Sequence, residues 1–211
     1  MVRVKICGLT REEDVSAAVR AGADAVGFIS GFPKSPRNVT FASAGRLMRR
    51  VPPFVDRVLV TTVEAVVQDI DAIRMMGLDA IQLYGQHPDF RELRRQVDAM
   101  MIRPYLIGGP QNGLKELDKF DAVLSDTFVD GKQGGTGKTS DWAACRRLRE
   151  TLAPMPFILS GGLNPMNVAD AIASVAPFAV DASSGVESSP GIKDVAKIEA
   201  FVEAAARWAG A

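Results

Sequence analysis

Short apolar runs alternate with longer stretches of helical period along nearly the whole chain. The runs end in small or polar residues, and the stretches between them repeat apolar residues at three- and four-residue spacing. The pattern predicts eight strands, at Val2–Cys7, Ala25–Ile29, Arg57–Val60, Ala80–Leu83, Met101–Tyr105, Ala122–Ser125, Phe157–Ser160 and Ala179–Asp181. Such alternation is typical of parallel strands covered by helices.

Helices are predicted after most of these strands. They lie at Arg11–Ala21, Phe41–Arg50, Val63–Met75, Asp89–Val97, Asp141–Leu152, Asn164–Ala173 and Val195–Trp208. Between the fifth and sixth strands, a Gly- and Pro-containing segment leaves room for only a short or irregular helix near Leu114–Lys119. We therefore expect a single (β/α)8 barrel domain over residues 1–211, with an irregular fifth helix.

Two apolar runs near the C-terminus each end in a Gly-rich turn. They read Phe157-Ile-Leu-Ser-Gly-Gly-Leu-Asn-Pro and Phe178-Ala-Val-Asp-Ala-Ser-Ser-Gly-Val. Small residues let backbone N–H groups approach an anion closely, and the positive end of a following helix adds to the attraction. As the last two strand-to-helix units, they predict a phosphate site between strands 7 and 8 of a barrel. The alternative is two ordinary turns.

Composition narrows the class of protein. The 25 Lys and Arg residues balance 25 Asp and Glu residues, which argues against broad binding of nucleic acid or of an anionic membrane but allows a small anionic substrate. Two cysteines without a CxxC motif favour neither a disulfide framework nor a Cys-rich metal site. With no signal-like N-terminus and no long apolar run, we expect a soluble, unprocessed cytoplasmic protein.

Cys7 ends the first predicted strand and therefore lies at the mouth of the expected barrel. A thiolate there could act as a base or nucleophile, but an ordinary thiol has a pKa of about 8.5 and needs a nearby positive charge or helix end to ionise. The alternative is a buried Cys that acts as a small apolar residue. Cys145, inside a predicted helix, is expected to pack in this way.

Asp126 follows the sixth predicted strand and points at the same mouth. It can act as a general acid if desolvation raises its pKa from about 3.9, or if a minor protonated population reacts. The alternative is a helix-cap or loop Asp. Asp181 ends another strand beside the expected phosphate site. Because its carboxylate would repel the phosphate, we expect it to point away or to be hydrogen-bonded structurally.

Two loops are longer than turning requires, at 30–40 and 126–140. Arg37 lies on the first, after a proline, where its guanidinium could hold a carboxylate; the alternative is a solvated Arg. The second contains Gly134-Gly-Thr-Gly-Lys-Thr, but Lys132 stands where a nucleotide-binding loop needs its first Gly. A flexible lid, with Gly135 contributing to phosphate binding, fits better. The single histidine, His87, is expected at the surface rather than at a metal.

A set of motifs from residue 4 to about residue 201 resembles the phosphoribosylanthranilate isomerase (TrpF) family. The motifs are Lys5-Ile-Cys-Gly-Leu-Thr, Lys34-Ser-Pro-Arg, Gln82-Leu, Leu124-Ser-Asp-Thr, Gly134-Gly-Thr-Gly-Lys, Asp141-Trp, Leu159-Ser-Gly-Gly-Leu-Asn-Pro-Met-Asn-Val, Val180-Asp-Ala-Ser-Ser-Gly-Val-Glu and Pro190-Gly-Ile-Lys-Asp. The resemblance implies a (β/α)8 barrel that catalyses an Amadori rearrangement in tryptophan biosynthesis, without a cofactor or a metal.

The resemblance also implies roles for individual residues. Cys7 matches the general base, Asp126 the general acid, and Arg37 the residue that holds the anthranilate carboxylate. The phosphate turns are matched by Gly161, Gly162, Ser184 and Gly185, with Gly135 as a further candidate from the lid. The expected partner is the small-molecule substrate, and the protein is expected to be a monomer or a homodimer.

Several positions depart from the family pattern around the expected anthranilate ring. Tyr84 stands where His is usual, Ser30-Gly31 where an aromatic residue is common, and Ser140 where Phe is usual; Val58-Leu-Val-Thr-Thr replaces a Gly-Val-Phe motif. These departures affect the expected affinity for the ring, or the substrate range, rather than the reaction.

Two other classes of function compete with this interpretation. A metal-dependent sugar-phosphate epimerase needs several converging His and carboxylate ligands, which a single His makes improbable. Indole-glycerol-phosphate synthase typically uses Lys and Glu at strand ends, whereas Lys5 is two residues short of such an end. A barrel that binds a phosphorylated metabolite without turnover would not need both Cys7 and Asp126.

Overall fold

The structure is a computed structural model that describes residues 1–107, 114–129, 132–133 and 140–207. Its strands are β1 (Arg3–Ile6), β2 (Ala25–Ile29), β3 (Asp56–Thr62), β4 (Ala80–Tyr84), β5 (Met100–Ile107), β6 (Ala122–Val129), β7 (Lys132–Gln133), β8 (Phe157–Leu159), β9 (Ala179–Ala182), β10 (Glu187–Ser189) and β11 (Ile192–Lys193). Its helices are α1 (Glu12–Ala21), α2 (Phe41–Met48), α3 (Val63–Arg74), α4 (Phe90–Gln96), α5 (Trp142–Leu152), α6 (Val168–Val175) and α7 (Val195–Ala206), with 3₁₀ helices η1 (Leu114–Lys119) and η2 (Ser184–Val186).

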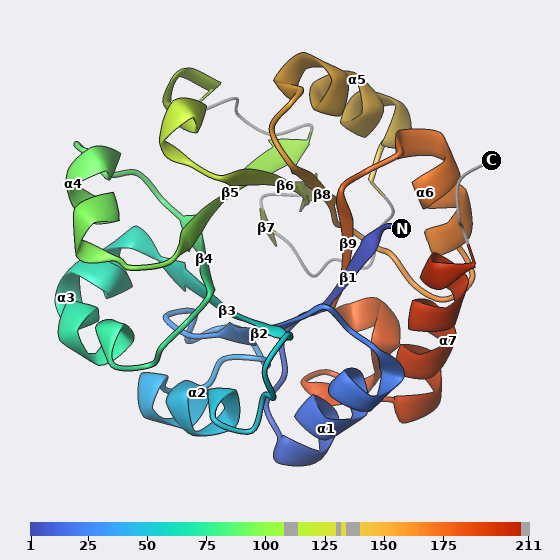
Figure 1. Ribbon diagram of the computed structural model, residues 1–211, viewed down its shortest axis with the longest axis horizontal. Coiled ribbons are helices and arrows are strands. Elements are labelled where there is room, and N and C mark those ends of the chain that lie inside the picture. Colours follow the sequence, from blue (N-terminus) through green and yellow to red (C-terminus); the bar gives the residue numbers. More distant parts are fainter. Residues whose placement is uncertain (108–113, 130–131, 134–139, 208–211) are drawn as a thin grey trace.

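Eight parallel strands form a closed barrel. Their order is β1-β2-β3-β4-β5-β6-β8-β9, and the pairing of β9 with β1 closes the ring. Figure 1 looks along the barrel, with the strands as an inner ring and α1 to α7 around them. The predicted (β/α)8 barrel is confirmed. The irregular fifth helix is confirmed as well, since η1 is a six-residue 3₁₀ helix.

Three local features differ from the prediction. Strand β6 continues to Val129, past the predicted end at Ser125, and pairs with the antiparallel β7, so Asp126 lies within a strand rather than after it. Helix α6 begins at Val168 rather than Asn164, because the side chains of Asn164 and Asn167 accept hydrogen bonds from nearby backbone N–H groups in a turn. The β10–β11 hairpin was not predicted.

The period of two along each strand separates the interior of the barrel from the layer beneath the helices. Side chains such as those of Phe28, Leu59 and Ile81 point outward and are fully buried against the helices. The amino-terminal half of the barrel interior is filled by a second apolar cluster, made of Val58, Ala80, Ile102, Ala122, Leu124, Ile158 and Ala179. The inward positions further along several of the same strands are polar.

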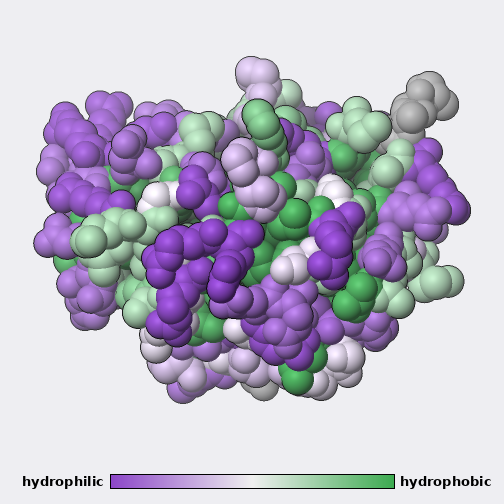
Figure 2. Space-filling view, turned by 60° about the horizontal axis from the view of Figure 1, so that its bottom comes forward, coloured by the Kyte–Doolittle hydropathy of each residue, from purple (hydrophilic) through white to green (hydrophobic). Residues whose placement is uncertain are grey.

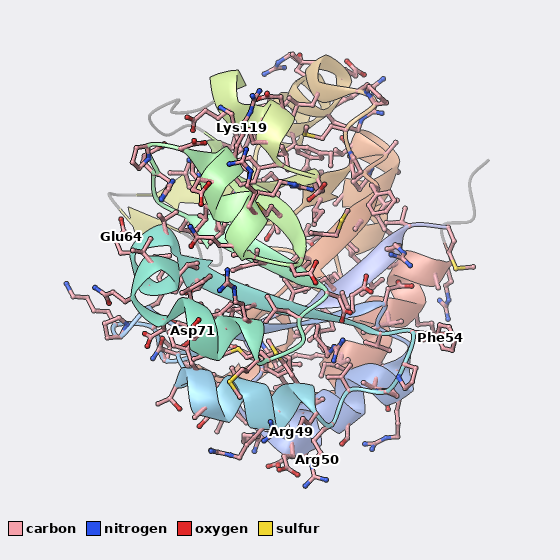
Figure 3. All side chains as sticks on the ribbon, turned by 60° about the vertical axis from the view of Figure 1, so that its left-hand side comes forward. Arg49, Arg50, Phe54, Glu64, Asp71 and Lys119 are labelled. Carbon is pink, nitrogen blue, oxygen red and sulfur yellow. The ribbon has the colours of Figure 1, made fainter. Side chains whose placement is uncertain are left out.

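The two ends of the barrel are visible in Figure 3, where Phe54 precedes β3 at one end and Glu64 opens α3 at the other. Arg49 and Arg50, just after α2, point into solvent in the same view. Hydrophilic residues cover most of the face in Figure 2, with smaller hydrophobic groups between them. None of the helices in the described part of the chain is long and apolar enough to span a membrane.

A repeated hydrogen bond ties neighbouring strands together at the amino-terminal end of the barrel. In three pairs of strands, an Asp just before the second strand accepts a bond from a backbone N–H of the first. The pairs are Val4 to Asp24, Arg57 to Asp79 and Met101 to Asp121, at 2.8, 2.8 and 2.7 Å. Phe178 occupies the equivalent position before β9. The repeat satisfies N–H groups that would otherwise be orphaned where each strand begins.

Asp79 provides a test of this repeat, because it also accepts two bonds from the Arg57 guanidinium, at 2.8 and 3.0 Å. We expect Asp79→Ala to lower the free energy of unfolding at pH 7 by about 1–2 kcal/mol, since a partly exposed ion pair adds little to the lost backbone bond. Urea unfolding would measure the change.

The hydrogen bond from Arg57 holds the pKa of Asp79 below its ordinary value. The stabilisation is therefore complete above the unfolded pKa of about 3.9 and is lost as the pH falls through the folded pKa, so the difference should shrink in acid. Asp71→Ala is the control, because the Asp71 side chain is 92% exposed, and should change stability by less than about 0.5 kcal/mol. Equal effects of the two substitutions would contradict this account.

Candidate active site

Polar inward positions surround a cavity of about 210 Å³ at the carboxyl ends of the strands. It is lined by Cys7, Ile29, Phe32, Ser35, Arg37, Val60, Gln82, Tyr84, Leu124, Asp126, Ser160, Asp181 and Ser183. Cys7, Arg37 and Asp126, which the sequence singled out separately, thus border one space. The parallel strands bring them together because all of their carboxyl ends open at the same mouth.

Cys7 follows β1 directly and is 5% exposed, with its N–H bonded to Ala182 O at 2.8 Å. Space for its sulfur depends on Gly27 of β2, since a Cβ there would lie 2.8 Å from Sγ. Burial raises the pKa of the Cys7 thiol above its ordinary value, although the nearby Lys5 ammonium acts in the opposite direction. The positive charge that the sequence analysis required is present, but it does not fully offset burial.

Asp126 enters the cavity from β6, which is separated from β1 in the ring by β8 and β9. It is 5% exposed, and its Oδ2 accepts a hydrogen bond from the Tyr84 hydroxyl at 2.8 Å. Tyr84 belongs to β4, so the carboxyl group is held by a strand other than its own. Two groups that are able to transfer protons, a thiol and a carboxyl, therefore face one cavity from different parts of the barrel.

A buried ion pair lies beneath Cys7. The Lys5 ammonium, on β1, donates to Asp181 Oδ1 at 2.9 Å and to Gln82 Oε1 at 3.2 Å. Burial disfavours the ammonium, but the charge of Asp181 outweighs this and holds the pKa of Lys5 above its ordinary value. Asp181 also accepts a bond from Ser160 at 3.3 Å. The structural hydrogen bonding expected for Asp181 is confirmed.

Arg37 already has an acidic partner within the protein. Its Nε and Nη2 donate to the two carboxylate oxygens of Glu187, each at 2.7 Å. Glu187 also accepts a bond from Lys193 at 2.9 Å, and together the two cations hold the pKa of Glu187 below its usual range despite its burial. Among the described residues, the Arg37 guanidinium donates only to Glu187, so its free edge, formed by Nη1 and the second N–H of Nη2, has donors for another carboxylate.

The two Gly-rich turns lie against each other. Gly185, within η2, lies so close to the turn after β8 that a Cβ on it would come 1.9 Å from Leu163 O. Gly161 and Gly162 both have positive φ, at 100° and 69°, which places them in the left-handed region that favours glycine. Ser184 opens η2. The predicted pair of turns is thus adjacent in space, while Gly135 lies outside the described residues.

Two serines form the cavity wall where these turns begin. Ser160 and Ser183 both line the cavity and directly precede Gly161 and Ser184. The Ser183 hydroxyl is buried and finds no hydrogen-bond partner among the residues that the structure describes. An unpaired buried hydroxyl is costly, so its position beside the turns suits an anionic ligand that supplies an acceptor.

The positions that depart from the family pattern, Ser30, Tyr84 and Ser140, differ from one another in whether they face the cavity. Phe32 lines the cavity, and its ring meets the Tyr84 ring edge-on at 5.4 Å, so an aromatic group is present just after Ser30-Gly31. Ser30 donates a hydrogen bond to Val39 O, and Ser140 to Ser160 O, both at 2.8 Å. These two hydroxyls therefore support the loops rather than the cavity wall.

The remaining candidates lie elsewhere. Cys145 packs inside α5 with no exposed surface, and burial raises its pKa to about 11. His87 is bonded to its neighbour Asp89 and packs near Phe90, away from the cavity. Within the described ranges, no group of three or more His, Cys, Asp or Glu side chains is arranged to hold a metal ion. The nucleotide-loop-like segment, residues 134–139, lies outside the described residues.

Sequence reasoning missed Lys5, Gln82, Glu187 and Lys193 as parts of the site. Lys5 and Gln82 could have been found from the sequence. Each is a polar residue within a buried strand, and each lies two residues before a residue that faces the barrel interior. Glu187 lies 150 residues from Arg37, and no local pattern links the two. Only the folded chain shows that contact.

Comparison with known proteins identifies the family. A family model described as N-(5′-phosphoribosyl)anthranilate (PRA) isomerase matches residues 4–204. The N-(5′-phosphoribosyl)anthranilate isomerase of Halobacterium salinarum is 45% identical over 208 residues, which are 96% of this chain and 94% of that protein.

Solved structures agree with this result. The phosphoribosyl anthranilate isomerase of Thermotoga maritima has a TM-score of 0.83 and 41% identity, covering 98% of this chain and 100% of that one. A phosphoribosyl anthranilate isomerase in complex with reduced 1-(o-carboxyphenylamino)-1-deoxyribulose 5-phosphate has a TM-score of 0.77 and 38% identity, with coverage of 98% and 100%. With its closed barrel and a match over nearly its whole length, this chain belongs to the N-(5′-phosphoribosyl)anthranilate isomerase family.

Proposed function

We propose that this protein converts N-(5-phosphoribosyl)anthranilate into 1-(2-carboxyphenylamino)-1-deoxyribulose 5-phosphate, with Cys7 as general base and Asp126 as general acid. The observation that carries the proposal is the meeting of a thiol and a carboxyl in one cavity, beside two adjacent Gly-rich turns. Membership of a family of isomerases of tryptophan biosynthesis supports the reaction. It needs no cofactor, because only protons move.

Asp126 begins the reaction by protonating the ring oxygen of the sugar. The ring opens and leaves an iminium ion between the anthranilate nitrogen and C1′. The Cys7 thiolate then removes the proton from C2′, and the electron pair of that bond forms an enolamine. Tautomerisation moves the enol proton from oxygen to C1′ and produces the ketone, so the net reaction is an isomerisation.

Anchoring at both ends of the substrate makes these transfers effective. Phosphate fits the paired turns with Gly161, Gly162, Ser184 and Gly185, where the unpaired Ser183 hydroxyl adds a donor. The anthranilate carboxylate fits the free edge of the Arg37 guanidinium. Holding both anions sets the sugar between the acid and the base, which replaces a random encounter by one orientation.

Lys5 favours ionisation of the Cys7 thiol, although burial opposes it. A thiolate in an apolar pocket would be strongly disfavoured, whereas the ammonium beneath Cys7 favours the ionised sulfur. Since the net pKa of Cys7 stays above its ordinary value, the thiolate is a minor species at neutral pH. Once the thiolate has formed, its high pKa makes it a stronger base toward the C2′ proton.

Turnover of the protein with and without its thiol tests the function. The loss of anthranilate-substrate fluorescence should report activity in the wild type, also in the presence of EDTA. Cys7→Ala should lower kcat by at least about 100-fold with the fold intact. Cys145→Ala, which removes the buried thiol of α5, is the matched control and should be nearly silent. A wild type that binds the product tightly without turnover would instead be a binding protein.

The role of Asp126 is tested by removing its acidic proton while keeping its size. Asp126→Asn should bind the product with near-normal affinity, because the amide keeps the shape and polarity of the carboxyl, but should turn over far more slowly. Titration of the product and steady-state kinetics separate the two effects. A change confined to KM would make Asp126 a binding residue.

The role of Arg37 is tested with two ligands. Arg37→Ala should weaken the carboxylated product by about 10- to 150-fold, the cost of a lost charge-assisted pair, and leave an analogue without the carboxylate unaffected. Arg37→Lys should recover only part of the loss, because an ammonium lacks the planar fork. Calorimetric titration measures both affinities. Equal weakening of both ligands would mean that Arg37 supports the loop or the phosphate.

A further inference from the structure

A line of hydrogen bonds crosses the cavity floor from Lys5, which lies beneath Cys7, to Asp126. Lys5 Nζ lies 3.2 Å from Gln82 Oε1, Gln82 Nε2 lies 3.2 Å from the Tyr84 hydroxyl, and that hydroxyl lies 2.8 Å from Asp126 Oδ2. The line begins beneath Cys7 on β1, passes through two inward positions of β4 and ends on β6. It therefore joins the surroundings of both proton-transfer groups.

Each bond in this line has one possible direction. The Lys5 ammonium has only donors, so Gln82 must present its oxygen to Lys5 and its NH₂ group to Tyr84. The Tyr84 oxygen then accepts from Gln82, and its single hydrogen points at Asp126. A neutral Lys5 amine could also accept a hydrogen bond, so the directions would no longer be fixed. The ion pair with Asp181, at 2.9 Å, keeps Lys5 charged.

We propose that Tyr84 is a positioning residue for the general acid: its hydroxyl donates to Oδ2 of Asp126 and holds the carboxyl group in its orientation toward the cavity. The edge-on contact with Phe32, at 5.4 Å between ring centres, keeps the Tyr84 ring in place. This inference rests on the proposed role of Asp126.

The hydroxyl of Tyr84 also makes Asp126 a stronger acid. A hydrogen bond donated to a carboxylate stabilises the ionised form and lowers its pKa. Burial and the charge of Asp126 raise the pKa of Tyr84 well above its ordinary value, so the hydroxyl keeps its hydrogen throughout the working range. The donor is therefore present in every protonation state of Asp126 that matters for catalysis.

Charged groups around Asp126 come from several elements. Cys7, directly after β1, Asp181 of β9 and Arg37 of the loop after β2 line the same cavity, and Lys5 is bonded to Asp181. All of them remain when Tyr84 becomes Phe, and this substitution also keeps the ring that packs on Phe32. A difference between wild type and Tyr84→Phe thus reports the hydroxyl alone.

The experiment measures the pKa of Asp126 in the full-length enzyme by NMR with ¹³C-labelled Asp carboxyl groups. The resonance is identified by its absence in Asp126→Asn. We expect Tyr84→Phe to raise this pKa by about one unit, the usual effect of one lost hydrogen bond to a carboxylate. Tyr105→Phe is the matched control, because Tyr105 is the second of the two tyrosines and is absent from the cavity lining, and should leave the pKa unchanged.

Kinetics provide a second readout. Because the Cys7 thiol ionises above the carboxyl, the acidic limb of the kcat/KM profile reports Asp126, and we expect it to move up by about one pH unit in Tyr84→Phe. An unchanged Asp126 pKa and an unmoved limb would overturn the inference, even with Asp126→Asn inactive. Normal turnover of Asp126→Asn would instead overturn the proposed acid, which is a separate result.

Discussion

The ion pair between Lys5 and Asp181 is the interaction on which the rest of the site depends. A lone ammonium inside a barrel would carry a large desolvation penalty, and removing either partner would leave a buried charge. With both present, the barrel interior changes from apolar side chains at the level of Ala80 and Ile158 to charged ones in the next layer. That polar layer forms the floor beneath Cys7 and Asp126, the proposed base and the proposed acid.

Strand parity explains why so few residues build this site. Each strand points every second side chain inward, and each therefore contributes one residue to the floor and the next to the rim. These are Lys5 on β1 with Cys7 directly after that strand, and Gln82 and Tyr84 on β4. A single inserted residue in such a strand would turn both side chains outward, so the floor and the rim are fixed together.

The sequence predicted the parts of the site whose signals are local. Cys7 and Asp126 stand where an apolar run meets a polar segment, and the glycines of the two turns carry their own conformational signal. The contacts that orient these residues were not predictable, because they join strands far apart in the chain, as Tyr84 and Asp126 do across 42 residues. The length of β6 was missed for a related reason, since the residues past Ser125 pair with β5 and with β7, and neither pairing has a local signal.

The position of Lys5 links the surroundings of the proposed base with those of the proposed acid. Its charge favours the thiolate above it, and the same charge orders Gln82 and, through it, the hydroxyl that faces Asp126. An apolar residue at this position would carry no desolvation penalty. Cys7 would then lose its counter-charge, however, and the line of hydrogen bonds would lose its direction. In the proposed mechanism, the buried ammonium therefore prepares Cys7 and Asp126 together, and Asp181 is the partner that keeps it charged.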